Sequence, residues 1–208
     1  MNTMFLSNTH GHHETLLLPR GDMIIHAGDF TKNGTESEAR EFLHWFSHLN
    51  YKYRIFIAGM RDAFFEQEPG LVRKLLPSNV IYLEESGVEA GGFKIWGSPF
   101  NTFNHGSAFS VSAGDEIREH WNKIPDEVDI VIGRMPAYGV HDEEGSGDHI
   151  GCKDLLRKLV RVEPNYFVCG NLHGVHRYEY RHDINFINAS LLNPEYKIAY
   201  KPVFQRNP

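Results

Sequence analysis

The stretch YRIFIAGMRD (residues 53–62) joins a strand pattern to an unusual polar turn. Its first six residues are rich in β-branched and aromatic side chains, as expected of a buried strand, and Gly59 then ends the run. A thioether, a guanidinium and a carboxylate follow, from Met60, Arg61 and Asp62. The stretch therefore predicts a strand whose end carries side chains capable of chemistry.

The same arrangement occurs at four other places along the chain. In each, an apolar run is followed by a glycine or another small residue and then by a polar group. The four polar segments are Asn8-Thr9-His10, Gly28-Asp29, Gly133-Arg134 and Gly170-Asn171-Leu172-His173. Because the carboxyl ends of strands share one edge of an α/β sheet, we expect all five segments to converge on one pocket.

Strand-like and helix-like runs alternate through the chain. Residues 35–49 show a helix pattern, because Thr35 and Glu38 form a capping box and Phe42 and Phe46 recur on one face. Further helices are predicted near 71–76, over 115–123 and over 152–162. The predicted strands are 23–27, 54–58, 80–83, 93–96, 129–132 and 166–169, with closing strands from residue 178 onward. This alternation predicts a single α/β domain over residues 1–208.

Composition argues against several classes of protein. The formal net charge of -6 is opposite to the basic footprint of a nucleic-acid binder. No apolar run approaches the ~20 residues of a membrane span, and the N-terminus lacks the basic start and apolar core of a signal peptide. Two cysteines, Cys152 and Cys169, are too few for a disulfide scaffold, which indicates a reduced, cytoplasmic protein. We therefore expect neither a nucleic-acid nor a membrane partner.

Taken in order, the five polar segments resemble the motifs of the calcineurin-like metallophosphoesterases. That family's pattern is Asp-x-His, Gly-Asp, Gly-Asn-His-Asp/Glu, Gly/Ser/Thr-His and Gly-His-x-His. The likeness covers nearly the whole chain and points to the small single-domain branch, through HAGDFTKNGT, KIWGSPF, MPAYGVHD, HIGCKDLL and INAS. The resemblance implies an α/β fold in which a sandwich of two mixed β-sheets is flanked by α-helices, with the site above the strand ends.

The resemblance also implies where two metal ions would bind. In the family one aspartate bridges the ions, which orient a phosphate and generate hydroxide from water. The first ion would be held at the positions of Asn8, His10, Asp29 and His173. The second would be held at the positions of Asp29, Met60, Arg134 and Asn171. Arg61 takes the place of the histidine that assists the leaving group.

The side chains at those positions do not suit two metal ions. Arg134 cannot lose its proton at ordinary pH and would repel a dication. At ~5 Å and an effective dielectric of ~20, each guanidinium costs a dication ~6 kcal/mol before screening. His10, Asp29 and His173 could still hold one zinc, iron or manganese ion, although Asn8 is neutral where the family has a carboxylate. We therefore expect no cofactor, or at most one divalent metal ion.

The expected site combines proton-transfer groups with fixed cations. Its predicted catalytic residues are His10, Asp29, Arg61, Arg134 and His173. Its predicted substrate-binding residues are Asn8, Met60, Asp62, His149 and Asn171.

Several of these residues have a structural alternative. His149 is either a proton donor or anion ligand, or else makes a hydrogen bond at a helix start. Asp62 either orients Arg61 or caps the segment that follows it. Arg61 and Arg134 either stabilise an anionic group in a reused pocket, or are only stabilising salt-bridge partners in an inactive one. The neighbouring His12 and His13 are interpreted as surface histidines.

Three functions remain open at this point. The first is a metal-independent enzyme of the isomerase, cyclase or lyase type, which uses the old pocket for acid/base and arginine-assisted chemistry on a small anionic substrate. The second is a non-catalytic binding module or scaffold, for which a protein partner is expected. The third is a weak phosphoesterase with one metal ion. The exchange of a dication for fixed cations favours either of the first two over the third.

Overall fold

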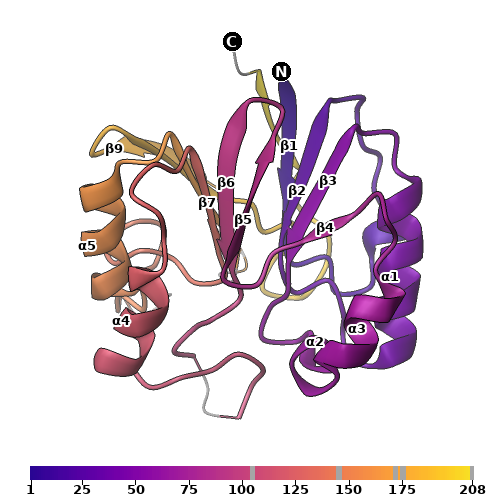
Figure 1. The fold of residues 1–208 in the computed structure, drawn as a ribbon, viewed down its shortest axis with the longest axis horizontal. Helices are drawn as coiled ribbons and strands as arrows, with labels where there is room; N and C mark the ends of the chain where they lie inside the picture. The colour runs from indigo at the N-terminus through magenta and orange to yellow at the C-terminus, as the bar shows by residue number, and fades with distance from the viewer. Residues whose placement is uncertain (104–105, 144–146, 171–172, 174–176, 207–208) are drawn as a thin grey trace.

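The computed structural model describes residues 1–103, 106–143, 147–170, 173 and 177–206. Two β-sheets face one another at the centre of the molecule, with helices on both outer sides (Figure 1). Helices α1, α2 and α3 lie on one side and α4 and α5 on the other (Figure 1). The predicted fold, a sandwich of two mixed sheets flanked by helices, is confirmed.

The first sheet has five strands in the order β11-β1-β2-β3-β4. Strands β1 to β4 pair in parallel, and β11 closes one edge by pairing antiparallel with β1. The bounds are β1 Asn2–Leu6, β2 Met23–Ala27, β3 Tyr53–Ile57, β4 Ile81–Tyr82 and β11 Val203–Arg206.

The second sheet has six strands in the order β5-β6-β7-β8-β10-β9. Its four middle strands are parallel, and the edge strands β5 and β9 run antiparallel to their neighbours. The bounds are β5 Ser86–Ala90, β6 Phe93–Ser98, β7 Ile130–Gly133, β8 Tyr166–Cys169, β9 Arg177–Arg181 and β10 Ile184–Asn188.

The helices match the predicted ones within a few residues. Thr35 caps α1 in a capping box with Glu38, as predicted. Three short elements, α2, β5 and the 3-10 turn η1, were not predicted. Helix α2 has five residues, too few to show a helical period, and β5 is a largely exposed edge strand without apolar alternation. The helices are α1 Glu36–His48, α2 Ala63–Gln67, α3 Pro69–Leu75, α4 Asp115–Asn122 and α5 Lys153–Val162, with a 3-10 turn η1 at His13–Thr15.

Alternation of side chains along the strands divides the core into layers. Ile25 of β2 lies between the sheets, together with Ile55 of β3 and Ile132 of β7. The next residue along, Ile24, faces the opposite way and packs with Phe42 of α1. A shift of one residue in strand register would exchange these two faces, so the apolar pattern fixes the register. No helix in the described ranges is long and apolar enough to cross a membrane.

The two sheets meet at the carboxyl ends of their parallel strands. Ser7, after β1, forms a parallel bridge with Ser190, which follows β10 in the other sheet. The polar segments predicted to share one edge therefore come from two sheets, with those after β1, β2 and β3 on one and those after β7 and β8 on the other. The site is built at this junction.

Candidate functional site

The centre of the candidate site is a buried ion pair that links the two sheets. Asp29 follows β2 and Arg134 follows β7, and their side chains are 2% and 1% exposed. Nη2 of Arg134 donates a hydrogen bond to Oδ2 of Asp29. The other carboxylate oxygen, Oδ1, accepts from the backbone N–H of Arg61 at 2.9 Å. Residues after β2, β3 and β7 thus converge on one carboxylate, and Arg134 places a fixed positive charge beside it.

Gly59 allows the turn after β3 to close over this pair. A Cβ atom at Gly59 would lie 2.3 Å from Oδ1 of Asp29 and 3.0 Å from Cδ of Arg134. Real Cβ atoms do not approach other atoms so closely, so a side chain here would displace the carboxylate. The glycine that ends the strand pattern is therefore required by the close packing of the site.

Asp62 lies beneath the turn and organises it. Its Oδ2 accepts from the backbone N–H groups of Asp29 and Gly59, at 2.9 and 2.8 Å. Its Oδ1 accepts from the N–H and the hydroxyl of Thr31, at 2.9 and 2.7 Å. Burial raises the pKa of Asp62 to about 7, the charge of Asp29 adds to the rise, and the hydrogen bonds from Thr31 and Gly59 oppose it. Its side chain makes no capping bond to α2, so that expected alternative is wrong.

His10 presents a buried ring nitrogen to the ion pair. Its Nε2 lies 3.9 Å from Oδ2 of Asp29, and no group in the described ranges makes a hydrogen bond to it. Burial lowers the pKa of His10 to about 3, Asp29 opposes this, and the charges of His173 and of the two arginines add to it. His10 is therefore neutral and has one polar atom that a ligand or a water molecule would satisfy.

His173 and Asn8 are joined by a hydrogen bond. Nδ1 of His173 lies 3.3 Å from the carbonyl oxygen of Asn193, which only accepts, so Nδ1 carries the proton. Its Nε2 is then an acceptor, and the amide Nδ2 of Asn8 lies 2.9 Å away as the donor. Burial lowers the pKa of His173, and the hydrogen bond to Asn193 opposes the shift. The lone pair that would bind a metal ion thus points at an N–H group.

Tyr196 covers the cluster and was not predicted. Its hydroxyl accepts from Nη2 of Arg61 at 3.0 Å, and the Arg61 guanidinium carbon lies 5.3 Å from its ring centroid. The same ring lies 4.7 Å from that of His173 and 5.5 Å from that of His10. Tyr196 is half exposed. The Asn-Pro pair three residues before it signals a turn, but not where the tyrosine points.

The structure brings most of the predicted site residues together, but not all. Asn8, His10, Asp29, Arg61, Arg134 and His173 form one cluster, which we call the central cluster. Met60 lies half-buried in the same turn, where its carbonyl accepts from the N–H of Ala108 at 3.2 Å. Asn171 lies outside the described residues. His149 lines a different cavity, bonded to Asp142.

One expectation about neighbouring histidines is wrong. His13 is buried, with its ring 4.9 Å from that of Trp45 and 5.7 Å from that of Phe42. The turn η1 packs on α1 and carries His13 into the core, whereas His12 stays exposed. Only His12 is a surface histidine.

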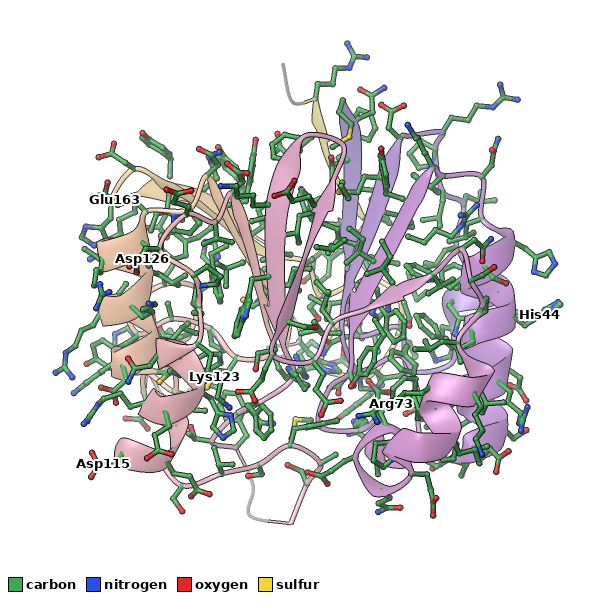
Figure 2. All side chains as sticks on the ribbon, in the orientation of Figure 1. His44, Arg73, Asp115, Lys123, Asp126 and Glu163 are labelled. Carbon is green, nitrogen blue, oxygen red and sulfur yellow. The ribbon has the colours of Figure 1, made fainter. Side chains whose placement is uncertain are left out.

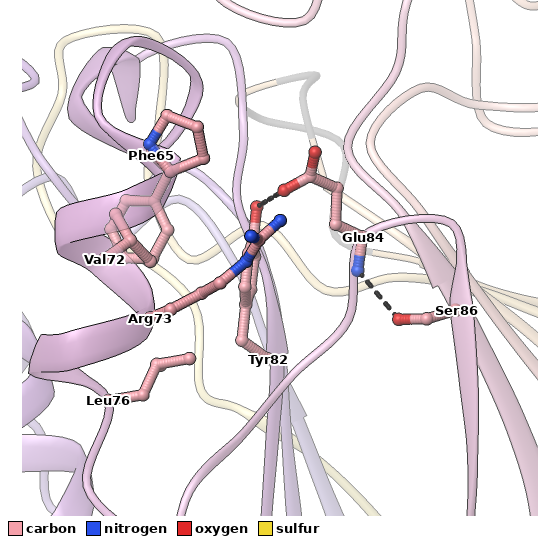
Figure 3. Close-up of a pocket in the computed structure, with 8 residues that line it drawn as sticks. Phe65, Val72, Arg73, Leu76, Tyr82, Glu84 and Ser86 are labelled. Carbon is pink, nitrogen blue, oxygen red and sulfur yellow. Dashed lines mark hydrogen bonds between the residues drawn. The ribbon is translucent and has the colours of Figure 1, made fainter.

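A small pocket lies beside α2 and α3 (Figure 3). Its volume is about 290 Å³, and the hydroxyl of Tyr82 donates to Oε2 of Glu84 within it at 2.9 Å. None of the central-cluster residues lines it. Its walls are Phe65, Pro69, Val72, Arg73, Leu76, Tyr82, Glu84 and Ser86.

Comparison with known proteins identifies the family. The family model for calcineurin-like phosphoesterases matches residues 3–175. The chain belongs to the calcineurin-like phosphoesterases. Among members of this family, the human metallophosphoesterase domain-containing protein 1 is 34% identical over 223 residues, which cover 95% of this chain and 68% of that protein. The UPF0046 protein C25E10.12 of Caenorhabditis elegans is 32% identical over 219 residues, which cover 95% of this chain and 78% of its own length.

The fold of this calcineurin-like phosphoesterase is also found among solved structures. The phosphopantetheinyl hydrolase of Mycobacterium tuberculosis superposes with a TM-score of 0.66, covering 94% of this chain and 90% of the hydrolase. Sequence identity is 12%, so this likeness concerns the fold alone.

The oxygen and nitrogen atoms that could bind metal ions in the central cluster do not fit the two-metal centre that the phosphoesterase family implies. Oδ2 of Asp29 is bonded to a guanidinium, and Nε2 of His173 faces an amide N–H. Across the described ranges, no three His, Cys, Asp or Glu side chains are grouped as metal ligands. The cluster offers cations and N–H donors where the family chemistry requires metal ligands.

Proposed function

We propose that this calcineurin-like phosphoesterase has lost the two-metal site and acts without metal ions on a small organic anion bound at the central cluster. The reaction class is that of an isomerase, cyclase or lyase. One observation carries the proposal: the buried pair of Asp29 and Arg134. A buried carboxylate needs a counter-charge, and here the chain supplies it as a guanidinium.

The charge of the central cluster favours an anion. Arg134 pairs with Asp29, whereas the Arg61 guanidinium has no carboxylate partner among the described residues. Within the described residues, the Arg61 side chain bonds only to neutral oxygens, the hydroxyl of Tyr196 and the carbonyl of Lys32 at 3.5 Å. A guanidinium held only by neutral partners attracts a carboxylate or phosphate group.

The histidines favour stabilisation of negative charge. With its pKa lowered to about 3, His10 is a neutral hydrogen-bonding group at neutral pH and a poor proton acceptor. Neutral imidazole can stabilise an enolate or a similar anion as a hydrogen-bond donor. We therefore assign His10 an electrostatic role in place of the proton transfer first expected of it, with Arg61 as its cationic partner.

A binding assay tests the anion site. Titration of the whole chain with inorganic phosphate, followed by calorimetry, should show saturable binding that Arg61→Met weakens by about tenfold or more, because one charge-assisted contact is lost. Arg40→Met is the matched control, since Arg40 lies on α1 and pairs with Glu36. Equal affinity of the Arg61→Met variant and the unsubstituted chain would contradict the proposal. Binding without turnover of any organic anion would favour the binding-module alternative.

A further inference from the structure

A second group of titratable side chains faces a cavity that the central cluster does not line. The cavity has a volume of about 570 Å³, within the usual range for small-molecule sites. It lies beside the starts of α4 and α5. Its lining includes Thr102, Ile117, Tyr138, His149, Cys152 and Lys153.

His149 is oriented in this cavity by a buried carboxylate. Its Nδ1 lies 2.8 Å from Oδ1 of Asp142, whose side chain is 1% exposed. An ionised carboxylate only accepts hydrogen bonds, so Nδ1 of His149 carries the proton. The lone pair is then on Nε2, at the opposite edge of a ring that lines the cavity. This is the arrangement in which a carboxylate prepares a histidine to accept a proton.

Asp142 is itself held rigidly. Its Oδ2 accepts from the backbone N–H groups of Gly139 and Gly151, at 2.9 and 3.0 Å. A Cβ atom at Gly151 would lie 2.6 Å from the same oxygen, so glycine is needed for the carboxylate to come this close. The loop is closed once more by a bond from the N–H of Ile150 to the carbonyl of Asp142, at 3.0 Å. The carboxylate that orients His149 is therefore positioned in advance.

His149 joins a buried carboxylate to the cavity. Oδ1 of the buried Asp142 holds one edge of the ring, while the His149 side chain is 42% exposed. A group fixed by a buried carboxylate yet open to a cavity is placed for chemistry.

The same cavity offers a cation and an apolar wall. Nζ of Lys153 lies 4.6 Å from the ring centroid of Tyr138, and the ring of His149 lies 5.3 Å from that of Tyr138. Lys153 forms no ion pair among the described residues. The buried Ile117 adds an apolar surface. A proton acceptor can activate water, a cation can stabilise an oxyanion, and apolar contacts can bind the organic part of a small carboxylic ester.

We propose that the Asp142–His149 pair is a second, general-base site that hydrolyses small carboxylic esters. Nε2 of His149 takes a proton from water as the water oxygen bonds to the ester carbonyl carbon. Lys153 faces the oxyanion that forms. The bond to the alcohol oxygen then breaks, and the imidazolium returns its proton to that oxygen, which releases an alcohol and a carboxylic acid. Asp142 is a positioning residue, and water is the only co-reactant.

Hydrolysis of p-nitrophenyl acetate by the whole chain tests this proposal. The chain should release p-nitrophenolate faster than buffer, and His149→Gln should lower the excess rate by about tenfold or more, because general-base catalysis is lost. His44→Gln is the control, since His44 lies on the outer side of α1, away from α4 and α5 (Figure 2). No excess rate, or an equal loss in both variants, would overturn the proposal.

The tautomer of His149 gives an independent readout that needs no turnover. Nitrogen chemical shifts of the imidazole ring should show Nδ1 protonated and Nε2 bare. In Asp142→Asn this preference should weaken and the esterase rate should fall with it, whereas a merely structural Asp142 would leave the esterase rate of the folded variant unchanged. A proton on Nε2 in the unsubstituted chain would overturn the proposal.

Discussion

Arg134 is the residue on which the proposed loss of the metal centre depends most. Its guanidinium is buried against Asp29, so its removal leaves a carboxylate without a counter-charge in a medium of low dielectric. We expect Arg134→Met to lower the free energy of unfolding by about 3–5 kcal/mol, measured by urea denaturation.

Two further variants distinguish the cost of leaving Asp29 buried without a counter-charge from the cost of removing an arginine in general. Arg40 and Glu36 form an exposed pair, so Arg40→Met should cost less than about 1 kcal/mol. Adding Asp29→Asn to Arg134→Met should restore much of the lost stability, because neither charge then remains buried. Equal costs for the two single arginine variants would show that burial of the Asp29 pair has no energetic consequence.

The turn after β3 is the element on which the site geometry depends. Gly59 packs so tightly against Asp29 that Gly59→Ala should destabilise the fold by about 1–3 kcal/mol, the usual cost of overpacking. Gly70 in α3 is the control, because a Cβ there meets nothing within 4 Å and alanine favours a helix. Gly70→Ala should be neutral or stabilising by up to about 1 kcal/mol. Thermal unfolding of both variants checks this, and a Gly59→Ala variant as stable as the parent would refute the close packing.

At the same scale, the sequence predicted elements with a strong local signal. The capping box of Thr35 and Glu38 predicted where α1 begins. The polar residues after five strands predicted the position of the central cluster. Both patterns lie in residues that are neighbours in the sequence, so they can be recognised without the structure. Tyr196 could not be predicted, since it reaches Arg61 from a turn 135 residues later in the chain. Nor could the burial of His13, which depends on how η1 packs on α1.

For the whole molecule, the family fold is present, and the loss of the family chemistry is our proposal. The chain has the sandwich and topology of a calcineurin-like phosphoesterase, and we propose that its central cluster no longer supports two-metal hydrolysis. The fold could be predicted because many segments along the chain each show a strand, helix or strand-end pattern consistent with it. The state of the cluster depends on a few hydrogen bonds between distant residues, such as that between Asn8 and His173.

The most direct test of the central claim is the metal content of the purified chain. Elemental analysis for zinc, iron and manganese, after dialysis against each ion, should give less than one equivalent per chain, and the same sample should not turn over a chromogenic phosphodiester. Two equivalents of metal ion together with turnover would contradict the account.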